Sequence, residues 1–232
     1  MGNGRVDAVH HLDADDGRQV FLAAVLLLGV FGLGAVLYKN HQAQQAAQLV
    51  AQNRAVLERA HAHTFGNPNA AVHIVEFFDP ACETCRDFYP LVKKMMAANP
   101  GKIKLSMRYA PLHKGSDEVV KAIEASRKQG MFQPTLEALF ASQGHWVLNH
   151  ASQVQLIWDP LSGLPLDLRR LQTDMNSPEV SQVIAQDMAD AKTLHVTMTP
   201  EYFVNGKPLP SFGYEELKKL VDDALIENSV GK

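Results

Sequence analysis

The residues best suited to chemistry are Cys82 and Cys85, the only cysteines among the 232 residues. The run from Ala71 to Phe78 before them is β-branched and aromatic and has strand length, and apolar residues recur at helical spacing from Arg86 to Ala98. The pair is therefore predicted to open a helix directly after a strand. Unpaired backbone N–H groups and the helix dipole stabilise a thiolate there. We expect Cys82, with a lowered pKa, to be the nucleophile and Cys85, one turn further in, to resolve the mixed disulfide.

Other uses of two thiols need to be considered. The pair could be half of a zinc site completed by histidines, a Cu(I) site completed by Met95 or Met198, or an inert structural disulfide. The remaining candidate ligands lack the companion spacing of a zinc module, being scattered as His61, His63, His113, His145, His150 and His195. We therefore expect redox chemistry through a Cys82–Cys85 disulfide, with no metal and no other cofactor.

The elements that must position the thiols follow an ordered pattern. A second strand is predicted from Ile103 to Tyr109. Four helical patterns then follow, at 116–129, 134–143, 166–175 and 178–194. The chain closes with a strand at Tyr202–Val204, the turn pair Asn205-Gly206, a short run at 207–209 and a helix from about 214 to 226. The predicted order is strand, helix, strand, helical block, hairpin and helix.

The segment from Val20 to Tyr38 contains no charged residue in 19 positions. As a helix it would be about 28 Å long, enough to cross a bilayer core. The following sequence, Lys39-Asn40-His41-Gln42, offers no small-residue cleavage site of the kind that ends a signal peptide. We therefore expect a short N-terminal tail (1–19) and a transmembrane anchor (20–38). Because residues 39–64 are rich in Ala and Gln, we expect them to form a helical stalk.

Composition excludes several classes of protein. The chain is 46% hydrophobic and 20% charged, which is not the composition of a disordered protein. Its net charge of −3 without a basic run argues against nucleic-acid binding. Two cysteines are too few for a multi-disulfide scaffold or a four-cysteine zinc module.

Two stretches carry a resemblance to a known family. Phe65 to Cys85, ending in Phe77-Phe78-Asp79-Pro80-Ala81-Cys82-Glu83-Thr84-Cys85, and Thr199-Pro200-Glu201-Tyr202-Phe203-Val204-Asn205-Gly206 resemble the DsbA family of thioredoxin-fold proteins. The resemblance covers about residues 65–228. It implies an α/β thioredoxin fold (65–113 and 195–232) interrupted by an inserted helical domain (114–194), here preceded by the anchor and stalk.

The resemblance also assigns roles to individual residues. It matches Cys82 to the nucleophile, Cys85 to its buried partner, and Thr199-Pro200 to a substrate-binding loop whose proline is cis. Glu76 matches an acidic residue buried beneath the active site. By strand alternation Glu76 shares a face with Ile74 and Phe78, so its pKa should be raised and it could take the proton of Cys85.

The residues between the cysteines depart from the family. Many family oxidases have Pro-His there, whereas this chain has Glu83-Thr84, which brings a negative charge beside Cys82 and should tune its redox properties. Five aromatic residues could line a peptide groove but are expected in the core instead, namely Phe77, Phe78, Phe88, Trp146 and Trp158.

The family implies an extracytoplasmic thiol–disulfide oxidoreductase. With the predicted anchor, we expect a single-pass protein of the bacterial cytoplasmic membrane whose catalytic domain faces the periplasm or cell exterior. Its partners would be cysteine-containing extracytoplasmic proteins and a membrane redox partner, either a quinone-linked oxidase or a reducing relay. The alternatives are a tethered Cu(I) metallochaperone that uses both thiolates and an assembly factor whose disulfide is idle.

Overall fold

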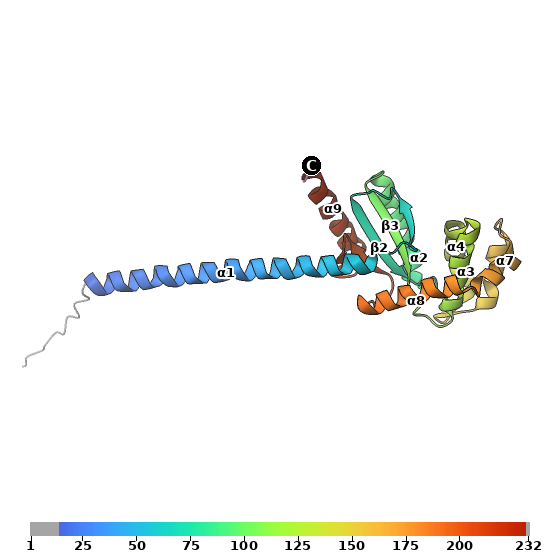
Figure 1. Ribbon diagram of the computed structural model, residues 1–232, viewed down its shortest axis with the longest axis horizontal. Helices are drawn as coiled ribbons and strands as arrows, with labels where there is room; N and C mark the ends of the chain where they lie inside the picture. The colour runs from blue at the N-terminus through green and yellow to red at the C-terminus, as the bar shows by residue number, and fades with distance from the viewer. Residues whose placement is uncertain (1–13, 231–232) are drawn as a thin grey trace, which may run out of the picture. The chain divides into compact units, whose positions relative to one another are not determined.

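The computed structural model describes residues 14–230, so the first part of the predicted tail lies outside the described residues. The first helix, α1 (Ala14–Leu57), contains the uncharged segment 20–38. Among the described residues, α1 is the one helix that is long and apolar enough to cross a membrane. Figure 1 shows α1 as one continuous helix. Its side chains from Arg18 to Leu49 are exposed. The predicted apolar helix is therefore present.

The predicted helical stalk is wrong in its last part, because α1 ends at Leu57 instead of continuing to residue 64. The guanidinium of Arg108 donates to the carbonyl oxygens of Val56 and Leu57 at 3.3 and 3.1 Å, which satisfies the end of the helix. The last turns of α1 also make tertiary contacts. Leu57 is buried, and the amide of Asn53 donates to the Gly206 carbonyl oxygen at 3.0 Å.

A five-stranded sheet forms the centre of the unit from Val50 to Lys232, in the order β1-β3-β2-β6-β7. The central strand β2 (Val72–Phe78) is parallel to β3 (Ile103–Tyr109) and antiparallel to β6 (Glu201–Val204). α2 (Glu83–Ala98) connects the two parallel strands, and β7 (Lys207–Pro208) and α9 (Tyr214–Val230) complete the fold. These elements were expected. The edge strand β1 (His63–Gly66) was not, because four residues carry no readable alternation.

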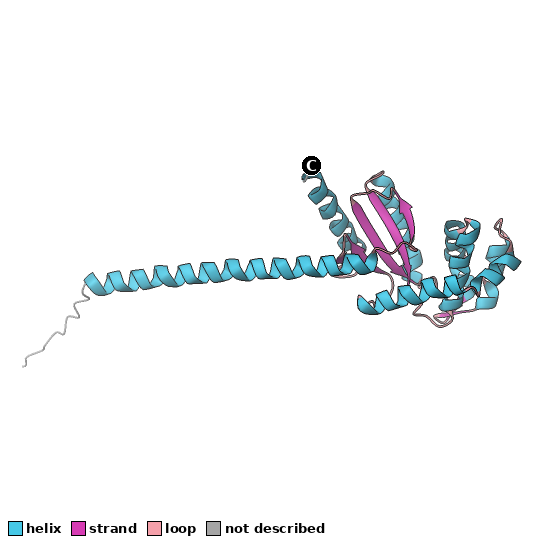
Figure 2. Cartoon of the chain, viewed as in Figure 1, coloured by secondary structure: helices cyan, strands magenta, loops and turns pink. Residues whose placement is uncertain are grey.

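Figure 2 shows the strands of the sheet side by side. Alternation along β2 separates two apolar clusters, one on each face. Ile74 and Phe78 pack with side chains of α2 and α9. Val75 and Phe77 pack on the other face with Leu57 of α1 and with residues from the end of α8 (Pro178–Thr193). The even-numbered face of β2, which includes Glu76, is therefore the one that α2 covers.

In sequence, a block of helices follows β3 and precedes β6, where the inserted domain was predicted. Besides α8 it contains α3 (Ser116–Ser126), α4 (Phe132–Ala141), α5 (Gln143–Trp146), α6 (Trp158–Ser162) and α7 (Leu168–Met175), with short 3-10 turns at Arg127–Gln129 and Val154–Leu156. Figure 1 shows α3, α4 and α7 of this block to one side of the sheet. Sequence periodicity located the four long helices. It missed α5, α6 and a small hairpin of β4 (Val147–Leu148) and β5 (Ala151–Ser152), which are too short to show a period.

The ion pairs of Arg108 join this block to the sheet. Arg108 is fully buried, and its guanidinium contacts Asp187 and Asp190 of α8 at 2.6 and 2.5 Å. Two residues that follow α1 bind the same carboxylates: Arg59 contacts Asp190 at 2.7 Å, and His61 contacts Asp187 at 2.6 Å. Because an unpaired buried charge is costly, this network fixes the chain between α1 and β1 against α8.

Candidate active site

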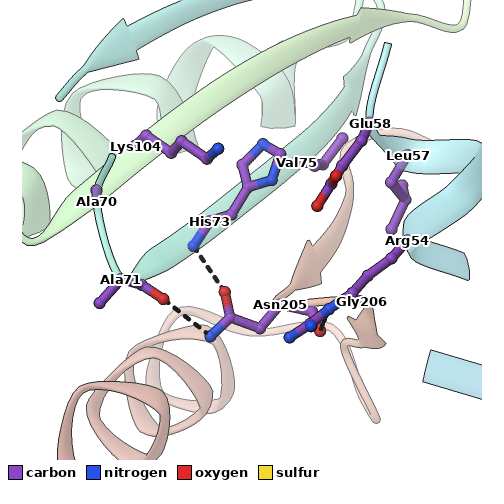
Figure 3. A pocket seen from close by; sticks show the side chains of 10 residues that line it. All are labelled: Arg54, Leu57, Glu58, Ala70, Ala71, His73, Val75, Lys104, Asn205 and Gly206. Atoms are coloured by element: carbon purple, nitrogen blue, oxygen red, sulfur yellow. Dashed lines mark hydrogen bonds between the residues drawn. The ribbon is translucent and has the colours of Figure 1, made fainter. Parts of the chain in front are cut away.

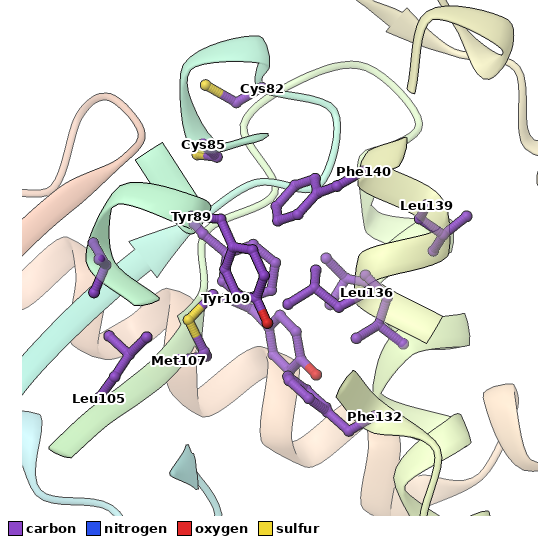
Figure 4. Close-up of a cluster of buried hydrophobic side chains, with 14 of the residues drawn as sticks. Cys82, Cys85, Tyr89, Leu105, Met107, Tyr109, Phe132, Leu136, Leu139 and Phe140 are labelled. Carbon is purple, nitrogen blue, oxygen red and sulfur yellow. The ribbon is translucent and has the colours of Figure 1, made fainter. Parts of the chain in front are cut away.

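The two thiols lie where a loop turns from β2 into α2. Cys82 is the N-cap residue of α2, with extended backbone angles (φ −78°, ψ 120°) and no side-chain cap. The first-turn N–H groups of α2 therefore point toward the Cys82 sulfur without a competing oxygen from its own side chain. Figure 4 shows both sulfurs at one end of the apolar cluster that contains Tyr89 and Phe140.

The environments of the two thiols differ in a way that separates their roles. A hydrogen bond from the Cys85 thiol, helped by the backbone N–H groups of Cys85 and Thr84, lowers the pKa of Cys82 from 9.0 to about 6. Burial raises the pKa of Cys85 well above its ordinary value. Cys85 is fully buried, whereas 6% of the Cys82 surface is exposed to solvent. The geometry thus favours a Cys82 thiolate and a protonated Cys85.

The loop before β6 lies against Cys82. The Thr199–Pro200 peptide bond is cis, and the Cys82 thiol donates to the Thr199 carbonyl oxygen at 3.1 Å. The structure therefore brings together the two predicted parts of the site, which are more than a hundred residues apart in sequence. The backbone of Thr199 therefore lies directly beside the Cys82 sulfur.

Glu76 lies beneath the pair in an apolar environment. It is fully buried, and burial raises the pKa of its carboxyl from 4.5 to about 8. The nearby Tyr202 hydroxyl favours the charged form of the carboxyl, but burial has the larger effect on its pKa. A neutral carboxylic acid that is free to gain or lose a proton near neutral pH is suited to proton transfer.

Two further residues organise the site and were not predicted. Asp79 is fully buried, and its carboxylate accepts from the Ala81 N–H at 2.8 Å, which shapes the loop before Cys82. The amide of Gln143, from α5 of the inserted block, donates to the carbonyl oxygens of Pro80 and Cys82 at 2.8 and 3.0 Å. The inserted block therefore holds the cysteine loop directly. An Asx turn at Asp79-Pro80 was readable from the sequence, whereas nothing local marks Gln143.

The residues between the cysteines point in different directions. Thr84 contributes its backbone N–H to Cys82, as described above. The Glu83 side chain is 46% exposed and lies near His150, with 3.7 Å between Glu83 Oε1 and His150 Nδ1. Its expected influence on the thiolate stays a prediction. Of the five aromatic residues expected in the core, Phe77, Phe78 and Trp146 are fully buried, whereas Phe88 and Trp158 are only partly buried against it.

A pocket elsewhere in the same unit does not belong to this site. It is lined by residues that include Arg54, His73, Lys104 and Asn205, at the end of the sheet where β2 begins (Figure 3). Asn205 holds the start of β2 there, accepting from the His73 N–H at 2.8 Å and donating to the Ala71 carbonyl oxygen at 3.3 Å. Since the thiols follow the opposite end of β2, this pocket is remote from them.

The inserted block is preceded by a β-α-β unit and followed by a hairpin and a helix, and a Cys-x-x-Cys pair stands at the start of α2. These features define the class of thioredoxin-fold thiol–disulfide oxidoreductases. Comparison with known proteins agrees. Residues 58–223 match the family model described as Thioredoxin, so the chain belongs to the thioredoxin family.

Three relatives place it more closely. A thioredoxin-like oxidoreductase from Silicibacter pomeroyi DSS-3 is 32% identical, with a TM-score of 0.64 over 74% of this chain and 96% of that one. A probable disulfide bond formation protein D from Bacillus anthracis is 26% identical over 89% of this chain and 94% of its own length. The α-DsbA1 of Wolbachia pipientis shares the fold, with a TM-score of 0.66 and 19% identity over 77% of this chain and 98% of that one. The predicted resemblance to DsbA-like proteins is therefore confirmed.

The chain also matches part of larger proteins. It is similar to Na(+)/H(+) antiporters named NhaA, including that of Herminiimonas arsenicoxydans, at 29% identity over 63% of this chain. It spans about a quarter of the length of that relative, 23%.

Proposed function

We propose that this chain is a membrane-anchored thiol–disulfide oxidoreductase that exchanges disulfides with cysteine-containing extracytoplasmic proteins. The observation that carries the proposal is the unequal pair, in which Cys82 lies at the helix start beside Thr199 and Cys85 is fully buried. The Cys82 sulfur is the one that a client can reach, and it is also the one whose negative charge the helix start stabilises.

In the oxidising direction, a client thiolate attacks the Cys82 sulfur of the Cys82–Cys85 disulfide. A client–Cys82 bond forms, the bond between the two protein sulfurs breaks, and Cys85 leaves as a thiolate that must gain a proton. A second client thiolate then attacks the client sulfur of the mixed disulfide and releases Cys82 as a thiolate. The client has lost two electrons and the cysteine pair has gained them; the reducing direction is the reverse.

Glu76 is the proposed proton carrier in both directions. Its carboxyl is buried on the same face of β2 as the thiols, with the Tyr202 hydroxyl nearby. Because its pKa is about 8, it can deliver a proton to the Cys85 thiolate and recover it at neutral pH.

The proposed location rests on α1. Its apolar segment is long enough to span a bilayer, and stable cysteine oxidation is typical of compartments outside the cytoplasm. We place residues 39–232 on the outer face of a bacterial cytoplasmic membrane. Electrons would then be exchanged with a membrane redox partner, either a quinone-linked oxidase or a reducing relay.

Insulin reduction, measured beside a Cu(I) titration, tests the catalytic proposal. With a thiol reductant as the electron source, the protein should accelerate precipitation of the insulin B chain, and Cys82→Ser should abolish the acceleration. An inactive protein that binds Cu(I) tightly through both thiolates would instead support the metallochaperone alternative. A protein inactive in both assays would be the redox-idle assembly factor.

A further inference from the structure

Three metal-ligating side chains that are scattered in the sequence meet beside the cysteine loop. Glu83, His113 and His150 each offer one ligand atom, and these atoms all lie within 4.8 Å of one another. Glu83 comes from the first turn of α2, His113 from the loop after β3, and His150 from the turn between β4 and β5. The sequence analysis expected no metal because the histidines lack a characteristic spacing, and folding removes that objection.

The two histidine-bearing segments are held together by backbone contacts. The Ser152 N–H of β5 donates to the Lys114 carbonyl oxygen at 2.8 Å, so the residue after His113 is bonded to the strand that follows His150. Gly115 keeps this approach close, because a Cβ there would lie 3.1 Å from the Ser152 carbonyl oxygen. The fold therefore holds the two backbone segments that carry the histidines next to each other.

His113 also has the outer partner that metal-bound histidines usually have. Its Nδ1 lies 2.8 Å from Oδ2 of the fully buried Asp79, which also accepts from the His113 backbone N–H at 2.8 Å and the Ser116 hydroxyl at 3.0 Å. Since a carboxylate can only accept, Nδ1 carries the hydrogen, which leaves Nε2 of the neutral imidazole as the ligand atom. Orientation of a ligand imidazole by a carboxylate is a recurring feature of zinc sites.

We propose that Glu83, His113 and His150 form a binding site for a zinc-class divalent cation, immediately beside the nucleophilic cysteine. Imidazole and carboxylate ligands suit Zn²⁺, whereas Mg²⁺ and Ca²⁺ prefer all-oxygen sites. Three protein ligands leave one position of a tetrahedral ion open. This site is separate from the two thiols and does not depend on the proposed redox function.

Small side-chain movements would complete the coordination. Ligand atoms about 2.0–2.1 Å from a tetrahedral ion lie about 3.3 Å from each other. The Nδ1 atom of His150 is already 3.7 Å from Oε1 of Glu83. These two side chains are 79% and 46% exposed, so both are free to move by the remaining distance, while His113 is held by Asp79.

The test is a Zn²⁺ titration of the full chain in detergent, without a histidine tag and with Cys82→Ser and Cys85→Ser introduced, so that the thiols cannot bind metal. Competition with a chromophoric chelator should give one Zn²⁺ per chain. His150→Ala and Glu83→Gln should each weaken binding by at least about tenfold. His145→Ala, which removes an exposed histidine outside the cluster, should leave the affinity unchanged.

Cobalt gives a second readout on the same protein. Bound Co²⁺ should show visible absorption typical of tetrahedral coordination, which His150→Ala removes and excess Mg²⁺ leaves intact. The proposal is overturned if the chain without thiols binds no stoichiometric Zn²⁺, or if His150→Ala binds as tightly as its parent. It is also overturned if His145→Ala weakens binding as much as His150→Ala does.

Discussion

Replacing Glu76 with glutamine should remove a loss of stability that the wild-type protein suffers as the pH rises. The side chain is fully buried on the face of β2 that α2 covers. Burial raises the pKa of this carboxyl to about 8, from an ordinary value of 4.5. Between pH 4.5 and pH 8 the folded chain therefore still holds a proton that the unfolded chain has already released.

The sign of the effect follows from proton linkage. Between about pH 4.5 and pH 8 the folded state binds more protons than the unfolded state, so the free energy of unfolding falls as the pH rises. For a single group with these two pKa values, the loss between pH 5 and pH 8 is about 3–4 kcal/mol. Glutamine has nearly the same shape and does not titrate, so the Glu76→Gln protein should lack this slope.

Urea unfolding of the reduced, detergent-solubilised protein from pH 5 to pH 8.5 measures the difference. Trp146, which is fully buried, provides a fluorescence signal. The Glu76→Gln variant should gain stability relative to wild type steadily across this range, whereas Glu215→Gln controls for the loss of an exposed carboxylate. Parallel curves for wild type and Glu76→Gln would refute the raised pKa and, with it, the proton-carrier role.

Three further outcomes follow from the same structure. Limited iodoacetamide treatment in the presence of a chelator should label Cys82 well before Cys85, as measured by mass spectrometry. The rate of Cys82 labelling should have its midpoint near pH 6. Equal labelling of the two cysteines would contradict the assigned roles. Alkaline carbonate should leave the protein in the membrane pellet if residues 20–38 span the bilayer, and protease added to spheroplasts should reach the catalytic domain. Gly206→Ala should destabilise the fold more than Gly101→Ala, by about 1–3 kcal/mol. Both glycines have positive φ, but only at Gly206 would a Cβ meet other atoms, at 2.8 Å, so equal thermal shifts would rule out a close approach there.

The sequence predicted the elements with the clearest patterns. The β-branched run before Cys82, the helical spacing after it and the Asn205-Gly206 turn each have one dominant physical cause, so β2, α2 and the hairpin were located within a residue or two. Alternation along β2 also placed Glu76 on the face that α2 covers. These features are local, which is why one sequence suffices to find them.

Features that depend on distant contacts could not be predicted. α1 ends at Leu57 because Arg108 binds its last carbonyl oxygens, and no local pattern around residue 57 shows this. The hold of Gln143 on the cysteine loop and the meeting of His113 with His150 arise only when the inserted block packs on the sheet. Such contacts join segments tens of residues apart, and single-sequence periodicity carries no information about them.

Trapping of mixed disulfides in cells tests the central claim most directly. In a chain with Cys85→Ser, the Cys82 thiolate can form a client disulfide but cannot resolve it internally. Non-reducing gels of membrane fractions should then show client adducts that disappear on reduction and are absent when Cys82→Ser is added. Adducts that form through Cys85 in a Cys82→Ser chain, or no adducts in either chain, would contradict the account.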